Sequence, residues 1–285
     1  MYEFVKMDSD EEYNPQYIIE VEVQKIINRT SRFLDCFIEF MKQESPDILR
    51  ETLTRFRNKL TQFEHTSLDP TSYEYTPSNF EFFPDVFEHI RAVSLSLLKY
   101  NDHIATEKDG KISVPYWNLV SSSEISLYIL GESLIDTIPR EQAIALFKRS
   151  IDFETDKTAK RDETITCIED FQKAAFSTAT PTHTGVMFLT SNGVLGSKTT
   201  RCMWADIFSK FPDSELAYAV ACHYDFNAAR YINKNFRLTR TKTLIQGDEF
   251  CDFCWHDISI DTEMKHPPEE FWKDLDDLVK NGSRQ

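Results

Sequence analysis

The hydrophobic pattern of this chain changes from a helical period to a strand period near Thr178. Before that residue, large apolar side chains such as Ile26, Phe33 and Phe37 recur at the spacing of an amphipathic helix. After it, short apolar runs alternate with polar residues and are separated by turn residues. The change predicts an α+β fold, with an N-terminal helical region followed by a small antiparallel sheet packed with helices.

The first 120 residues are expected to form a flexible lead-in and then a helical region. Residues 1–16 are acidic and predict a flexible N-terminus, and residues 17–120 carry the helical period. Ser45-Pro46 reads as a helix start, with serine as the cap and proline in the first helical position. The expected elements, in chain order, are a helix over 17–44, a helix from Pro46 through Leu60, a loop over 66–83 and a helix from Pro84 through Leu97.

The remainder, residues 121–285, is expected to be a second domain with both helices and strands. The stretch 106–123 contains the turn signal Asp109-Gly110 and Pro115, and it is the predicted boundary. An Asn-Gly turn at 192–193 and a second turn at 246–248 predict two hairpins. The expected elements are helices over 123–131, 139–152, 162–177, 203–210 and 214–231, strands over 185–190, 194–202, 236–245 and 249–258, and a last helix after Pro267-Pro268.

Composition and charge narrow the class of protein. With 32 basic and 47 acidic residues, the net charge is −15, so nucleic acid is not an expected partner. No apolar run approaches the roughly 20 residues that span a bilayer, and residues 1–13 lack a signal peptide's basic and apolar regions. We therefore expect a cytoplasmic protein, with no membrane partner and with thiols rather than disulfides. No P-loop or GxGxxG pattern occurs, and no cofactor is expected.

The segment Cys222-His223-Tyr224-Asp225 carries the first candidate chemistry. On the expected helix, Cys222 and Asp225 would share a face, because residues three apart are neighbours there. A thiol needs a nearby cation to become a good nucleophile, and His223, Arg237 and Arg240 are the candidates. The alternative is that Cys222 is a small buried core residue, which is the usual place of a free cysteine.

The segment Cys251-Asp252-Phe253-Cys254 is the second candidate, with His256 close behind it. On a strand the two cysteines would face opposite sides, and no second cysteine pair lies nearby in the sequence, so a zinc site is not expected. Asp252 is unusual within a strand, and such an exception often marks a functional site. The alternative is an exposed strand face or a sheet edge.

Together these segments resemble the L-2-amino-thiazoline-4-carboxylic acid hydrolase family. The ordered pieces are Arg201-Cys202, Cys222 to Asp225, the basic and Thr-rich stretch from Phe236 to Leu244, Gly247, and Cys251 to Phe253. The resemblance implies that residues 121–285 form a hydrolase-like α+β domain, which opens a cyclic amidine, the thiazoline ring, to a carbamoyl-cysteine. It implies site residues at Cys202, Cys222, Asp225, Arg240, Gly247, Cys251 and Asp252. We expect Cys222, Asp225, Asp252 and Cys251 to be catalytic and Arg240 and Cys202 to bind substrate, and we add Arg237 and His223 as substrate-binding candidates because of their charge.

The sequence leaves the reaction at this site open. The attacking group is either the Cys222 thiolate or an activated water. The partner is a small molecule, and the same residues would suit a tailoring enzyme that closes or rearranges a ring, because ring closure reverses amidine hydrolysis. The sequence also allows a small-molecule-binding domain without catalysis, and a zinc protein that uses Cys251, Cys254 and His256.

Overall fold

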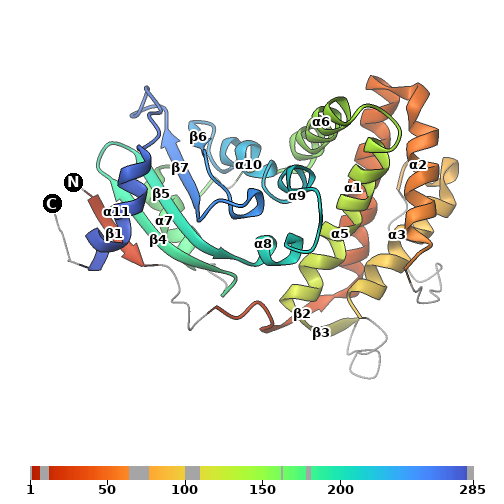
Figure 1. Ribbon diagram of the computed structural model, residues 1–285, viewed down its shortest axis with the longest axis horizontal. Coiled ribbons are helices and arrows are strands. Elements are labelled where there is room, and N and C mark those ends of the chain that lie inside the picture. Colours follow the sequence, from red (N-terminus) through yellow and green to blue (C-terminus); the bar gives the residue numbers. More distant parts are fainter. Residues whose placement is uncertain are drawn as a thin grey trace. The chain divides into compact units, whose positions relative to one another are not determined.

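Two units of different architecture make up the chain (Figure 1). The computed structural model describes residues 2–6, 13–63, 77–99, 110–161, 163–177 and 181–280. The sheet unit comprises Met1–Pro15, Thr158–Tyr218 and Cys222–Gln285, and the helical unit comprises Gln16–Lys157 and Ala219–Ala221. The helical unit therefore runs to Lys157, whereas the sequence predicts its end near residue 120.

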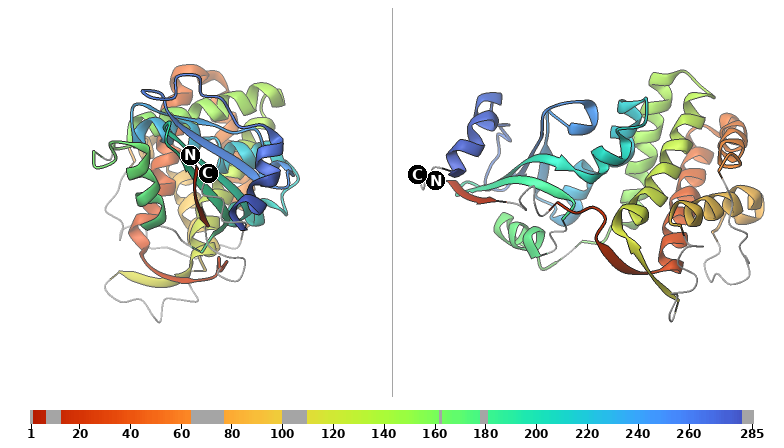
Figure 2. Two further views of the ribbon diagram at one scale, coloured as in Figure 1. Left: turned by 90° about the vertical axis from the view of Figure 1, so that its left-hand side faces the viewer. Right: turned by 60° about the horizontal axis from the view of Figure 1, so that its bottom comes forward.

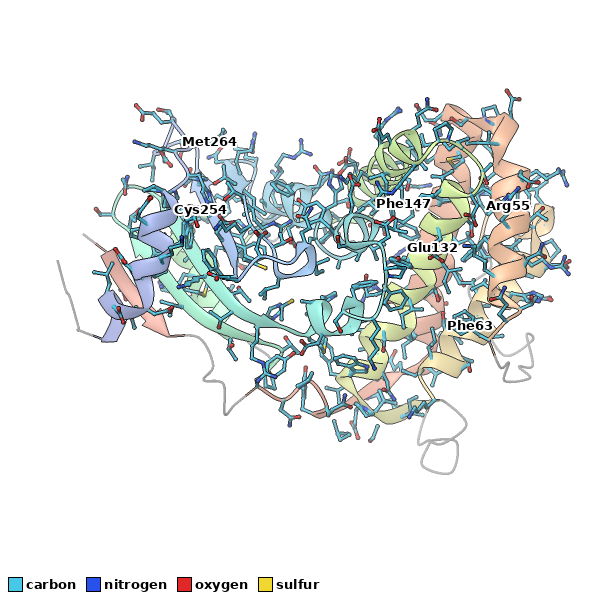
Figure 3. All side chains as sticks on the ribbon, viewed as in Figure 1. Arg55, Phe63, Glu132, Phe147, Cys254 and Met264 are labelled. Atoms are coloured by element: carbon cyan, nitrogen blue, oxygen red, sulfur yellow. The ribbon has the colours of Figure 1, made fainter. Side chains whose placement is uncertain are left out.

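In the described residues of the helical unit, four helices pack against one another and a fifth lies beside them. Helix α5 contacts α2 and α3, and α1 contacts α3. Phe147 of α6 packs against Phe33 of α1, with ring centroids 6.4 Å apart (Figure 3). The bounds are α1 Val23–Glu44, α2 Pro46–Leu60, α3 Pro84–Leu97, α5 Tyr116–Ile135 and α6 Arg140–Thr158, with a short 3₁₀ turn at Phe80–Phe82. The expected loop over 66–83 lies largely outside the described residues.

A two-stranded sheet in this unit was not expected from the sequence. Strand β2, Ile18–Glu22, pairs antiparallel with β3, Lys111–Pro115. The prediction that the first helix begins at residue 17 is therefore wrong, because α1 starts at Val23. Ile18, Ile19 and Val21 are β-branched residues, and pairing with a distant strand outweighs their local helical period.

The sheet unit is built on five antiparallel strands in the order β1-β4-β5-β7-β6. Helices α7 and α10 pack on one face with Leu195 and Phe236, and α11 packs on the other with Phe188 and Cys254 (Figures 1 and 2). The strands are β1 Tyr2–Lys6, β4 His183–Thr190, β5 Val194–Cys202, β6 Phe236–Thr239 and β7 Cys251–Asp257. The helices are α7 Ile168–Ser177, α8 Met203–Phe208, α9 Ser214–Ala221, α10 Tyr224–Ile232 and α11 Glu269–Lys280. This confirms the expected α+β class.

Two expectations about the strands are corrected. Residues 1–16 are not simply a flexible lead-in, because Tyr2–Lys6 forms edge strand β1 along β4. The strand expected over 236–245 ends at Thr239. It ends there because the backbone N–H groups of Thr241 and Lys242 donate to the Asp252 carboxylate instead of to a neighbouring strand.

A β-bulge interrupts the pairing of β4 with β5 between Thr184 and Gly185. His183 lies opposite Cys202, and Gly185 lies opposite Thr199, so Thr200 is the extra residue. A side chain at Gly185 would place its Cβ 1.9 Å from the Lys198 carbonyl oxygen, so only glycine fits. None of the helices in the described part of the chain has the length and apolar character to span a bilayer.

Candidate functional site

Arg240 is the centre of the candidate site. It follows the last residue of β6, and its side chain is 1% exposed. Its Nη1 donates to Asp225 Oδ2 at 2.7 Å, and its Nη2 donates to the Cys222 carbonyl at 2.8 Å and to the Tyr218 hydroxyl at 3.3 Å. These bonds fix the guanidinium and connect the end of β6 to the start of α10.

Aromatic rings surround the same guanidinium. Its carbon lies 5.3 Å from the ring centroid of Tyr218, 5.1 Å from that of Phe226 and 4.7 Å from that of Phe253. Burial alone would lower the pKa of Arg240, but the charge of Asp225 outweighs it and the pKa is raised. In the described residues no acceptor lies on its buried Nε. The Nε–H of a buried, charged group is therefore available to another acceptor.

Cys222 and Asp225 lie near each other, but not for the expected reason. The predicted helix over 214–231 is broken: α9 ends at Ala221, Cys222 is its C-terminal cap, and α10 begins at Tyr224. The two residues therefore do not share one helix face, which corrects that expectation. Arg240 bonds the C-terminal end of α9 at the Cys222 carbonyl and also bonds Asp225, so it joins the two helices.

Three thiols gather around this ion pair. Cys202, Cys222 and Cys251 lie close enough for their charges to influence one another and to be influenced by Asp225. Burial raises the pKa of Cys202 to about 12 and that of Cys251 to about 11, and it raises the pKa of Cys222 well above its usual value. All three are therefore neutral thiols near neutral pH, and Cys202 is the most exposed of them.

His183 is a site residue that sequence reasoning missed. Its Nε2 lies 3.4 Å from Cys202 Sγ, and its Nδ1 lies 3.0 Å from the Thr182 hydroxyl oxygen. The ring stacks on Trp204, with centroids 5.3 Å apart. Burial lowers the pKa of His183 to about 4, so the imidazole is neutral and can accept a proton.

A second polar network lies on the opposite face of the sheet, on the side of α11. The Asp252 carboxylate accepts from the N–H groups of Thr241 and Lys242 at 2.8 and 2.7 Å and from the Thr241 hydroxyl at 2.5 Å. His266 Nε2 lies 3.0 Å away. From His266 the bonds continue through Thr239 to His256, and then to Asp261. Asp252 therefore anchors the backbone directly after Arg240.

The residues of this site lie in a part of the chain that matches a known protein family. A family model described as L-2-amino-thiazoline-4-carboxylic acid hydrolase matches residues 120–255. The resemblance to this family is thereby confirmed for those residues. The match includes the whole Arg240 cluster, His183 and Asp252. Searches of curated proteins and of solved structures found no significant match.

The expected site residues of the thiazoline hydrolase family divide into two groups. Arg240 bonds Asp225 and the Cys222 carbonyl, and its charge acts on the Cys222 and Cys251 thiols. Cys202 and His223 lie near enough to Asp225 for an electrostatic interaction with it. Arg237 instead donates to the carbonyl oxygens of Lys234 and Phe236. Asp252 faces the other side of the sheet, where its carboxylate accepts the N–H groups of Thr241 and Lys242. Its catalytic role stays a prediction.

The CxxC segment lies along β7 with its thiols in different surroundings. Cys251 Sγ accepts from the Leu244 N–H at 3.2 Å, whereas Cys254 is buried against the face that α11 covers (Figure 3). Between β6 and β7, Gly247 ends the 3₁₀ turn Leu244–Gln246 with a φ of +94°. Among the described residues, no group of three or more histidine, cysteine or acidic side chains is arranged to hold a metal ion.

Asp252→Ala is expected to destabilise the sheet unit by about 2–3 kcal/mol near pH 7, because it leaves two backbone N–H groups without their acceptor. Burial opposes the charge on Asp252, but its hydrogen bonds outweigh that effect and lower the pKa. Its contribution is therefore complete above the unfolded pKa of about 3.9 and is lost as pH falls through the lower folded pKa.

Urea unfolding at several pH values measures this effect. The difference between wild type and Asp252→Ala should be largest near neutral pH and should shrink in acid. The exposed Asp274, on α11, is the matched control, and its alanine variant should unfold like wild type. A difference that stays constant down to pH values near 3 would contradict the proposed charge dependence of the anchor.

Proposed function

We propose that the sheet unit is a small-molecule hydrolase that opens a cyclic amidine carrying a carboxylate, a substrate of the 2-aminothiazoline-4-carboxylate type. The observation that carries this proposal is the Arg240–Asp225 ion pair, whose charges act on nearby thiols, inside the region that matches the thiazoline hydrolase family. A buried guanidinium, a carboxylate and thiols are the groups that such a substrate needs, because it has an anionic end and an electrophilic amidine carbon.

Asp225 and Arg240 have complementary roles in this proposal. The Asp225 side chain is 32% exposed, so its carboxylate is available to a cationic amidinium. The Nη atoms of Arg240 already bond Asp225, Cys222 and Tyr218, and its Nε–H is a donor available to the substrate carboxylate.

Two further functions would use the same residues. A tailoring enzyme would run the reaction in reverse, closing a ring by condensation at the same amidine carbon. A binding domain would hold the ligand through Asp225 and Arg240 without attack by a thiol. Both predict ligand-dependent thermal stabilisation, but only an enzyme converts the ligand, so product analysis separates the three functions.

The experiment is a mass-spectrometric screen of cyclic amidines, and of their ring-opened counterparts, with purified protein. Asp225→Asn should lower kcat/KM for a cationic amidine by about 10- to 100-fold, since it removes the opposite charge. Glu163→Gln, an exposed carboxylate of the same unit, is the matched control and should leave kcat/KM unchanged. If no amidine is converted in either direction but one binds, the hydrolase proposal fails and the binding function replaces it.

A further inference from the structure

The three thiols of the site differ in one respect that bears on which of them reacts. Cys222 and Cys251 are buried. Backbone N–H groups act on two of the sulfurs: the Leu244 N–H on Cys251, and the Trp204 and Ala205 N–H groups on Cys202. Cys202 is half-buried, and a histidine nitrogen lies 3.4 Å from its sulfur. Among the described hydrogen bonds, this is the one that joins a thiol to a histidine, and a nucleophile beside a base is the arrangement that covalent catalysis requires.

The backbone sets this arrangement, not a chance side-chain rotamer. His183 opens β4 and Cys202 closes β5, and the strand register places them directly opposite each other. Side chains of opposite residues in an antiparallel pair lie on the same face and in contact. The bulge at Thr184 and Gly185 produces this register, and bulges are common beside active sites because they re-aim a side chain.

The ring of His183 is held with one nitrogen toward the thiol. Nδ1 lies 3.0 Å from the Thr182 hydroxyl oxygen, and the imidazole stacks on Trp204. When Nδ1–H donates to that oxygen, the lone pair of Nε2 faces Cys202. Other titratable groups near the Cys202 sulfur include the thiols of Cys222 and Cys251, the Asp225 carboxylate and the Tyr13 hydroxyl, which donates to Asp206.

We propose that Cys202 is the nucleophile and His183 its general base in the reaction proposed above. This inference rests on the proposed hydrolase function and replaces the expectation, drawn from the sequence, that Cys202 only binds substrate. Cys222 and Cys251 then line the site beside the ion pair. Because both members of the dyad are neutral, the proton moves from sulfur to nitrogen during the attack rather than before it.

The step balances without any further reactant except water. The Sγ–H proton passes to His183 Nε2 as Sγ bonds to the amidine carbon, and the C=N electrons move to nitrogen. When C=N re-forms, the bond to the leaving ring atom breaks, and that atom (the ring sulfur of an aminothiazoline) takes the proton from His183. Water then loses a proton to His183 and bonds to the same carbon. The Sγ–C bond breaks, Sγ regains a proton, and a ring-opened carbamoyl product leaves.

The test uses cyanamide as a probe, followed by intact-mass analysis and peptide mapping of the full chain. Cyanamide has the same electrophilic carbon between nitrogens, and a thiol adds to it to give an isothiourea with no oxidant. We expect one adduct on Cys202 in wild type, none on that peptide in Cys202→Ala, and at least about tenfold slower labelling in His183→Gln. Cys254→Ala, a buried thiol on the other face of the sheet, is the control and should label like wild type.

With a cyclic amidine, His183→Gln should lower kcat by about 10²- to 10³-fold with little change in KM, as expected for a general base. Cys202→Ser keeps the shape of the site should Cys202→Ala fail to fold. An adduct on Cys222 or Cys251, or His183→Gln labelling as fast as wild type, would overturn the dyad. Amidine turnover by Cys202→Ala would overturn the dyad and leave the hydrolase proposal standing. A His183-dependent adduct on Cys202 without turnover of any amidine would support the dyad and overturn the hydrolase proposal.

Discussion

Arg240→Met should lower the free energy of unfolding by about 3 kcal/mol and remove any turnover of a carboxylate-bearing amidine. The substitution leaves the Asp225 carboxylate and the Cys222 carbonyl without the donor that now bonds both. It also removes a cation that lies close to three aromatic rings. Methionine is chosen because its long, flexible side chain can fill the same space without a charge. Urea unfolding measures the loss of stability, and the family's expected substrate measures the loss of activity.

A double-mutant cycle with Asp225→Leu identifies the cause of this loss. If the uncompensated carboxylate is responsible, adding Asp225→Leu to Arg240→Met should restore much of the lost stability but none of the activity. Arg237→Met is the matched control, because Arg237 donates only to carbonyl oxygens in the described contacts, and it should cost less than about 1 kcal/mol. Equal losses for the two arginine variants would mean that the ion pair does not hold the site together.

The sequence predicts the secondary structure of both units well where the pattern is local. The Asn-Gly turn identified the β4–β5 hairpin, and the helices after Pro46 and Pro84 begin where proline predicts them. It fails where a distant segment decides the structure. Ile18–Glu22 is a strand because Lys111–Pro115 pairs with it, and the partner lies about ninety residues away in a stretch with weak signals.

The site shows the same division. The resemblance grouped Cys222, Asp225, Arg240 and Cys251, and the structure places them near one another, although a helix break and not a shared helix face positions the first two. Counting residue pairs along the β4–β5 hairpin almost predicts the neighbour of His183. From the Thr190–Val194 pair, an unbroken hairpin places His183 opposite Arg201, and the one-residue bulge moves it to Cys202. The sequence at Thr184-Gly185 does not predict that bulge, because a glycine within a strand can also mark a bend or a close approach of another backbone.

Gly185→Ala therefore tests the fold and the site together, and we expect it to cost about 3 kcal/mol or more. The new Cβ would lie 1.9 Å from the Lys198 carbonyl oxygen and 3.0 Å from the Thr199 Cα. These are backbone atoms of β5, so relief requires the two strands to separate or to lose the bulge. Either change moves His183 away from Cys202, because the register through the bulge is what places them opposite each other.

Gly247→Ala is the matched control for this variant. Gly247 also has a positive φ, +94°, but an added Cβ meets nothing within 4 Å, so it should cost only about 1 kcal/mol from the backbone conformation. Urea unfolding compares the two losses, and cyanamide labelling of Cys202 in folded protein reports the register. If Gly185→Ala unfolds like wild type and labels Cys202 at the wild-type rate, the bulge does not build the dyad. A larger loss than Gly247→Ala together with slow labelling would tie the strand register to the reactivity of the thiol.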